Sequence, residues 1–135
     1  MKTQSQPHPH PTHDDDYVLR LTDIVRQTAY ELYRYLGPGH FEKVYERGLA
    51  HRLRKLGIHV DTQFGLSVFD EDDTPLGDYC CDLFVERCLL VELKACTTLS
   101  SDHLAYILGY LRAGRERHGM IINFGPQFQV KKLVV

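Results

Sequence analysis

Three charged side chains interrupt two strongly apolar segments of the chain. Asp82 lies in the segment CCDLFV, and Glu92 and Lys94 lie in LLVELK. Both segments show the two-residue period of β-strands. Alternate side chains of a strand share a face, so Glu92 and Lys94 point the same way, as do Cys80, Asp82 and Phe84. Unpaired charges resist burial, so these residues call for a chemical explanation.

The two segments are predicted to pair as a β-hairpin. Glu86-Arg87 lies between them and is short enough for a tight turn. Pairing about this turn places Asp82 almost opposite Val91 or Glu92. Two carboxylates and an ammonium group can therefore converge at one end of the hairpin.

Converging carboxylates repel each other, and a bound divalent cation is the usual remedy. Oxygen ligands with retained water suit Mg²⁺ or Mn²⁺. A lysine beside such a metal can orient or activate a water, or neutralise charge in a transition state, which suits phosphodiester hydrolysis. The alternative is that Glu92–Lys94, or Asp82–Lys94, is an ion pair on a solvated sheet face. The hairpin and the surrounding Leu and Val residues argue against a solvated face.

The elements that must position these groups follow from the spacing of the apolar residues. Helical spacing predicts helices over residues 22–36, 41–56 and 102–113. Thr22 or Asp23 is the expected N-cap of the first helix. Gly37 is expected to supply a left-handed C-terminal cap for the first helix, which Pro38 cannot continue, and Gly57 and Gly114 are expected to end the other two.

Period-two patterns predict the strands, over residues 59–69, 78–86, 88–95, 119–125 and 128–134. The acidic segment 70–75 is the expected turn between the first two. The element order is α-α-β-β-β-α-β-β. The helix between strands 88–95 and 119–125 implies that these two strands are parallel, whereas the hairpins are antiparallel. The sequence therefore predicts an α/β domain over residues 17–135, with a mixed sheet and helices on its faces.

Two motifs resemble those of a known family. The pattern Asp82-x9-Glu92-Leu93-Lys94 on a hairpin resembles the signature of the PD-(D/E)XK nuclease superfamily. The segment GHFEKVY, residues 39–45, is similar to the Gly-x-x-Glu-x-x-Tyr motif of the bacterial GxxExxY proteins, a branch of that superfamily. The likeness continues through LRKLG, GDY, VELKA, YL and INFG and covers roughly residues 20–135. It implies a restriction-endonuclease-like core of three layers.

The resemblance also implies roles for individual residues. Asp82 and Glu92 would be metal ligands for Mg²⁺ or Mn²⁺, with the backbone carbonyl of Leu93 as a third ligand. Lys94 would position or activate the attacking water. Glu42 would complete the acidic cluster, directly or through a water. The alternative for Glu42 is that it favours the helix dipole or caps the helix, because it lies in the first turn.

Further residues are candidates for substrate contact. Tyr45 lies on the same helical face as Glu42, where it either hydrogen-bonds the site or packs in the core. Arg47 is one of several basic residues of the second helix that either contact DNA or lie on a solvated face. Related nucleases often carry Gln four residues before the Tyr of the third helix. Here Tyr106 precedes Tyr110, and a phenol cannot copy an amide's donor–acceptor pair. This departure counts against efficient catalysis.

The cysteines and the N-terminal histidines are given structural interpretations. The spacing of Cys80, Cys81, Cys88 and Cys96 matches no zinc or iron–sulfur pattern, so they are expected to be small buried residues. Residues 1–16 hold three of the six prolines and almost nothing apolar, which predicts a disordered tail. Metal binding by His8, His10 and His13 would then be adventitious.

Composition excludes several classes of protein. The 135 residues suffice for one domain. No apolar run is long enough to span a bilayer, and the N-terminus has no signal-like apolar region, so a membrane or secreted protein is not expected. The resemblance implies a bacterial cytoplasm. The net charge of −2 is less basic than is usual for a strong nucleic-acid binder, so we expect weak intrinsic DNA affinity or a partner that delivers the substrate.

Two functions are therefore in view. The first is an enzyme, a Mg²⁺-dependent nuclease that hydrolyses phosphodiester bonds of DNA, with RNA as the other candidate substrate. The alternative is a catalytically weak or inactive nuclease-fold module that binds nucleic acid or a protein partner, or forms a homo-oligomer.

Overall fold

The structure, a computed structural model, describes residues 14–135. Within them, three helices and five strands follow one another in the predicted order. Their bounds are α1 Asp15–Leu36, α2 Glu42–Lys55, β1 Val60–Phe69, β2 Pro75–Val85, β3 Leu89–Lys94, α3 Ser101–Gly114, β4 His118–Phe124 and β5 Phe128–Val134. No helix formed by these residues is long and apolar enough to cross a membrane.

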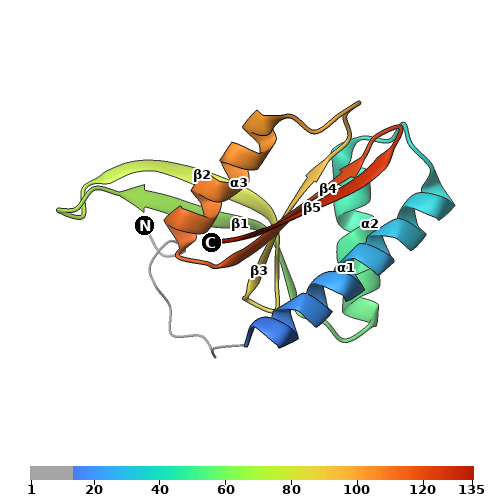
Figure 1. Cartoon of the computed structure of the whole chain (residues 1–135), viewed down its shortest axis with the longest axis horizontal. Coiled ribbons are helices and arrows are strands. Elements are labelled where there is room, and N and C mark those ends of the chain that lie inside the picture. The colour runs from blue at the N-terminus through green and yellow to red at the C-terminus, as the bar shows by residue number, and fades with distance from the viewer. Residues whose placement is uncertain (1–13) are drawn as a thin grey trace.

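The strands form one mixed sheet in the order β1-β2-β3-β4-β5. β3 and β4 are parallel and are joined by α3, while the other neighbouring strands are antiparallel. Helices α1 and α2 cover one face of the sheet and α3 lies across the other (Figure 1). The predicted three-layer α/β fold is confirmed.

Two apolar clusters hold the layers together. α1 and α2 pack on one face, where Tyr45 and Leu49 meet side chains of β2, β3 and β4. α3 packs Ile107 and Leu111 on the other face. β4 is buried along its whole length, and β3 is buried up to Leu93. Strands buried on both faces are typical of parallel pairs that helices cover, so a charged residue in β3 is costly and needs a compensating partner.

The first helix begins earlier than predicted. The Asp14 carboxylate accepts a hydrogen bond from the Tyr17 N–H at 2.7 Å and caps α1, which starts at Asp15 and not at Thr22. Asp15 and Asp16 lie in the first turn, where negative charge favours the helix dipole. Asp14, Asp15 and Asp16, which were predicted to belong to the tail, therefore belong to α1 and its cap. Residues 1–13, with their three histidines, lie outside the described residues.

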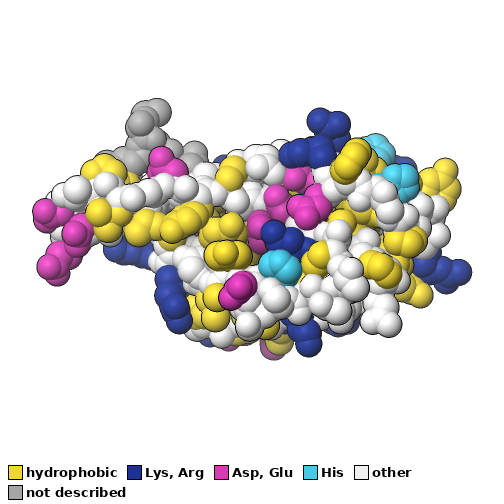
Figure 2. All heavy atoms as spheres, turned by 90° about the horizontal axis from the view of Figure 1, so that it is seen from above, with side chains coloured by type: hydrophobic (Ala, Val, Ile, Leu, Met, Phe, Trp, Pro, Cys, Tyr) yellow, Lys and Arg dark blue, Asp and Glu magenta, His cyan; other side chains and the backbone are white. Residues whose placement is uncertain are grey.

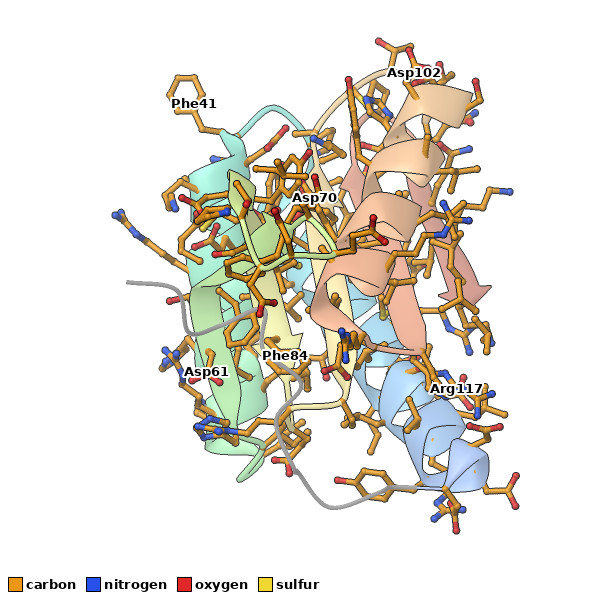
Figure 3. All side chains as sticks on the ribbon, turned by 90° about the vertical axis from the view of Figure 1, so that its left-hand side faces the viewer. Phe41, Asp61, Asp70, Phe84, Asp102 and Arg117 are labelled. Carbon is orange, nitrogen blue, oxygen red and sulfur yellow. The ribbon has the colours of Figure 1, made fainter. Side chains whose placement is uncertain are left out.

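The second helix starts one residue later than the predicted range 41–56 and ends at Lys55. Phe41 precedes the helix and points away from the molecule (Figure 3), with 86% of its surface exposed. The buried residues are instead Tyr45, Glu46, Leu49, Ala50 and Leu53. Tyr45 stacks on Phe124 with ring centroids 4.4 Å apart. Its hydroxyl donates to the Gly37 carbonyl at 2.6 Å, which fixes the loop between α1 and α2.

The tight turn between β2 and β3 forms at the predicted place. Glu86 and Arg87 both have positive φ, 51° and 54°. The Cys88 N–H closes the turn by donating to the Val85 carbonyl at 3.0 Å. Because Val85 pairs with Leu89, Cys88 also belongs to the loop, which is one residue longer than the predicted turn. The other long hairpin, β1–β2, projects from the body as an arm (Figure 1).

Candidate active site

The site forms where β2 and β3 separate. Their paired residues run from Val85 opposite Leu89 to Leu83 opposite Val91, which is one of the two predicted registers. Beyond Leu83, side chains replace the main-chain acceptors. The Asp82 N–H donates to Glu92 Oε1 at 2.9 Å, and the Leu93 N–H donates to Asp82 Oδ2 at 2.8 Å. Each carboxylate is therefore oriented by the backbone of the opposite strand.

The electrostatics of this pair favour a cation. Only 8% of the Glu92 surface is exposed. Burial, and then the negative charge of Asp82, raise the pKa of Glu92 to about 7. Lys94 acts in the opposite direction on the pKa of Glu92, but more weakly than burial and Asp82. A divalent cation at the pair would relieve the repulsion that Lys94 and the N–H donors compensate only in part.

Lys94 is half-buried at the end of β3. Among residues 14–135, it forms no ion pair with Asp82 or Glu92. The alternative of an ion pair on a solvated face therefore does not describe this site, and the ammonium group is left for another partner.

Asn123 fixes the chain immediately after Lys94. Its side chain is fully buried, accepts from the Cys96 N–H at 3.0 Å and donates to the Cys96 carbonyl at 2.9 Å. Gly125 completes this contact, since a Cβ there would lie 1.8 Å from the Cys96 carbonyl oxygen. Asn123 and Gly125, in the INFG segment, therefore fix the position of the backbone that follows β3.

A third carboxylate comes from α2, and the sequence analysis did not select it. Glu46 is buried, and its Oε1 accepts from Gln63 Nε2 at 2.7 Å. The same Gln63 nitrogen donates to Asp82 Oδ1 at 3.2 Å. Lys43 Nζ lies 3.1 Å from Glu46 Oε2. Gln63 therefore links Glu46 to the Asp82–Glu92 pair.

A signal for Glu46 was present in the sequence. It stands three residues before Leu49 and four before Ala50, on the buried stripe of α2. An acidic residue on a buried stripe is as anomalous as Glu92 in its strand. Glu42 lies one turn earlier and is exposed. α2 thus brings Glu46, rather than Glu42, into the hydrogen-bonded set.

The remaining predicted contacts fall into two groups. Tyr45 is buried in the core, which favours the packing alternative over a contact with substrate. Arg47 is exposed and lines a hollow beside Glu46 and Gln63, with Lys43. Figure 2 looks onto this end of the sheet and shows a cluster of acidic side chains with basic side chains beside it.

Tyr106 and Tyr110 line a groove of about 700 Å³ between α3 and the β1–β2 arm. Tyr106 is 61% exposed. Burial, and then the charge of Glu92, raise the pKa of Tyr110 to about 12, so its phenol stays protonated near the carboxylates. The ring of Tyr79 lies 5.7 Å from that of Tyr110. The groove therefore adjoins the carboxylate pair and presents aromatic surface.

The four cysteines are all free thiols. Cys81 and Cys88 are buried as expected, Cys96 is half-buried, and Cys80 is exposed on β2. Burial raises the pKa of the Cys81 thiol well above its usual value. The described residues contain no cluster of three or more His, Cys, Asp or Glu side chains able to hold a metal. The site thus offers one pair of acidic ligands, not a closed cage.

The family comparison agrees with this geometry. Residues 19–133 match the model of the PD-(D/E)XK nuclease superfamily. The chain belongs to the PD-(D/E)XK nuclease superfamily. In this PD-(D/E)XK protein, the residues predicted to carry the signature, Asp82, Glu92 and Lys94, all lie where β2 and β3 separate. The narrower likeness to the GxxExxY proteins stays a prediction.

Solved structures support the fold of this PD-(D/E)XK protein. The chain is similar to a structure titled "Crystal structure of SSO0001", with a TM-score of 0.53 and 14% sequence identity. The match covers 93% of this chain and 70% of the other. No curated protein sequence matches the chain.

Proposed function

We propose that this protein is a Mg²⁺-dependent nuclease that hydrolyses phosphodiester bonds of DNA. The observation that carries the proposal is the convergence of two carboxylates, Asp82 and Glu92, where β2 leaves β3. Lys94 lies two residues beyond Glu92 on the same strand and has no ion-pair partner among the described residues. Superfamily membership supports the same reaction class.

The donor set fits a hard divalent cation. Asp82, Glu92 and the Leu93 carbonyl would hold it, and Mg²⁺ commonly uses one or two carboxylates together with waters and substrate phosphates. Mn²⁺ accepts the same oxygen ligands. When bound, such a cation stabilises charge on a phosphoryl oxygen and lowers the pKa of water.

Three side chains would act beside the cation. The Lys94 ammonium group orients the attacking water or neutralises charge that develops on the phosphate. Glu46, linked to Asp82 through Gln63, extends the acidic set on the α2 side. Glu42 is exposed at the start of α2, from where it would reach the set through a water.

The surroundings of the site favour nucleic acid as the substrate. Lys43 and Arg47 line the hollow on the α2 side, where they would contact phosphates. Tyr106 and Tyr110 line the groove on the α3 side, where a base would stack. RNA offers the same phosphates and bases, so the assay includes it.

Metal titration and cleavage test the proposal together. Mg²⁺ and Mn²⁺ binding would be measured by calorimetry on the wild type, Asp82→Asn and Glu92→Gln. Glu31→Gln is the matched control, because Glu31 is exposed on α1. The same samples would be assayed on plasmid DNA, single-stranded DNA and RNA. We expect binding and cleavage in the wild type and the control, and neither in the two site variants.

Two other results would contradict the proposal in different ways. Failure of the wild type to bind millimolar metal would refute metal-dependent hydrolysis. Metal binding without cleavage of any substrate would favour the second candidate, a catalytically weak module that binds nucleic acid or a protein partner. The replacement of an amide by the phenol of Tyr106 is the feature that favours this second candidate.

A further inference from the structure

Gln63 has an unusual backbone for its position. Its φ is +51°, which L residues other than Gly, Asn and Asp rarely adopt. The other four such residues among 14–135 lie at chain reversals or a helix end: Asp73, Glu86, Arg87 and Arg115. Gln63 alone lies inside a strand, β1. The β1–β2 pairing passes over it, from Thr62 opposite Leu83 to Phe64 opposite Cys81.

The positive φ of Gln63 directs its side chain toward three hydrogen-bond partners. Nε2 donates to Glu46 at 2.7 Å and to Asp82 at 3.2 Å, so both hydrogens of the amide nitrogen are given to carboxylates. Oε1 accepts from the Cys80 thiol at 3.4 Å. The amide thus makes contacts on α2 and at two points of β2. An ordinary extended strand would direct the side chain elsewhere, because the local backbone sets its direction.

The neutrality of the amide matters for the proposed chemistry. Two carboxylates that face each other need donors or a cation between them. A lysine or arginine at this position would neutralise their charge. An amide satisfies their lone pairs and leaves the negative potential available to a divalent cation.

We propose that Gln63 is a positioning residue that binds Glu46 and Asp82 into one unit and thereby assigns Glu46 to the active site. The inference rests on the proposed metal-dependent nuclease and extends it to two residues outside the family signature. Glu46 then acts from α2 on water or phosphate at the cation, while Gln63 acts only through the carboxylates that it orients.

Gln63→Gly provides the test, because it removes the amide and also relieves the positive φ. The matched control is Asp73→Gly, at an exposed turn residue with φ +68°. We expect the unfolding midpoint of Gln63→Gly to stay within a few degrees of the wild type. Calorimetry with Mn²⁺ alone should show affinity about tenfold weaker, and DNA cleavage should lose about 10–100-fold in kcat with little change in KM. Asp73→Gly should match the wild type in both.

A double variant distinguishes positioning from a general structural role. If Gln63 acts through Glu46, Gln63→Gly combined with Glu46→Gln should lose no more Mn²⁺ affinity than the more damaging single variant. Should Gln63→Gly fail to fold, Gln63→Asn replaces it. Asn tolerates positive φ, but it is one methylene too short to reach both carboxylates.

Each remaining outcome decides between the two proposals. Wild-type Mn²⁺ affinity and kcat in Gln63→Gly, or strictly additive losses in the double variant, would overturn the role of Gln63 and leave the nuclease proposal intact. Absence of Mn²⁺ binding in the wild type would overturn both.

Discussion

At the scale of single residues, Asp82 and Glu92 take the place of main-chain acceptors at the end of a β-ladder. The backbone N–H groups of Asp82 and Leu93 fix the two side chains in orientation. This arrangement destabilises the metal-free protein, because Glu92 is buried beside a second carboxylate and the pKa of Glu92 rises to about 7. Strain of this kind is common where a protein is shaped for binding rather than for stability.

The raised pKa of Glu92 predicts a pH-dependent stability. The folded pKa, about 7, exceeds the ordinary value of 4.5, so the folded state binds more protons between these limits. The free energy of unfolding of the metal-free protein should therefore fall as pH rises through that window. Glu92→Gln should remove on the order of 1–3 kcal/mol of this fall. Urea unfolding at pH 5 and pH 8 in EDTA measures it, and an unchanged pH dependence in the variant would count against the assignment.

The hydrogen bonds between the Asn123 side chain and the Cys96 backbone predict a measurable contribution to stability. Asn123→Ala leaves the Cys96 N–H and carbonyl unsatisfied and also removes the acceptor of the Gly125 N–H. The expected loss is about 2–4 kcal/mol of unfolding free energy. Asn123→Asp keeps the acceptor but sets a buried carboxylate oxygen against the Cys96 carbonyl oxygen, so it should lose at least as much. A loss well below about 1 kcal/mol for Asn123→Ala in chemical denaturation would contradict this role of Asn123.

At the scale of elements, the β2–β3 hairpin sets the site. The loop of Glu86, Arg87 and Cys88 fixes the register, and continuing that register beyond Leu83–Val91 places Asp82 opposite Glu92. A slip of one residue would turn the charged set to the opposite face of β3. The geometry of the carboxylate pair therefore depends on a turn at the far end of the hairpin.

A substitution in the β2–β3 turn should increase the stability of the protein. Arg87 is exposed and has φ +54°, so Arg87→Gly should raise the unfolding free energy by about 0.5–1 kcal/mol without affecting metal binding. Arg20→Gly is the matched control, because Arg20 is exposed within α1 and the change should cost about 1 kcal/mol there. Thermal or urea unfolding compares the two, and a loss of stability in Arg87→Gly would contradict the strain argument.

At the scale of the whole molecule, the site lies between two different surfaces. The α2 side is a basic hollow and the α3 side is an aromatic groove beside the β1–β2 arm. The arm's turn is acidic, with Asp70, Glu71, Asp72 and Asp73 in sequence, and the chain as a whole carries −2. Such a balance favours weak, salt-sensitive contact with nucleic acid over tight non-specific binding.

Metal binding should stabilise the whole molecule. A ligand that binds only the folded state contributes about 2.7 kcal/mol at 100 times its Kd, which would raise the melting temperature of a domain of this size by roughly 10 °C. We expect this shift with Mg²⁺ in the wild type and Glu31→Gln, and no shift in Asp82→Asn. A shift of equal size in Asp82→Asn, followed by thermal unfolding, would place the metal elsewhere.

Local patterns determined a large part of the architecture. The periods of the apolar residues predicted the order of all eight elements among residues 14–135. Glu86-Arg87 predicted the place of the turn and two possible registers, of which the structure has the one that brings Asp82 opposite Glu92. These features depend on neighbours in the sequence, so they can be read without knowledge of the fold. The start of α1 was predicted seven residues too late, because the capping role of Asp14 shows only once Val18 and Leu21 have a core to pack against.

Only the tertiary structure decided which further residues belong to the site. Glu42 and Glu46 are both acids on α2, and the packing of the helix on the sheet determines which one faces Asp82. The contribution of Gln63 depends on one backbone angle inside a strand and on partners 17 and 19 residues away. The sequence by itself determined the hairpin and its charged signature, because these are local. The third carboxylate and its amide link required the fold, because helix and strand meet there only after the chain has packed.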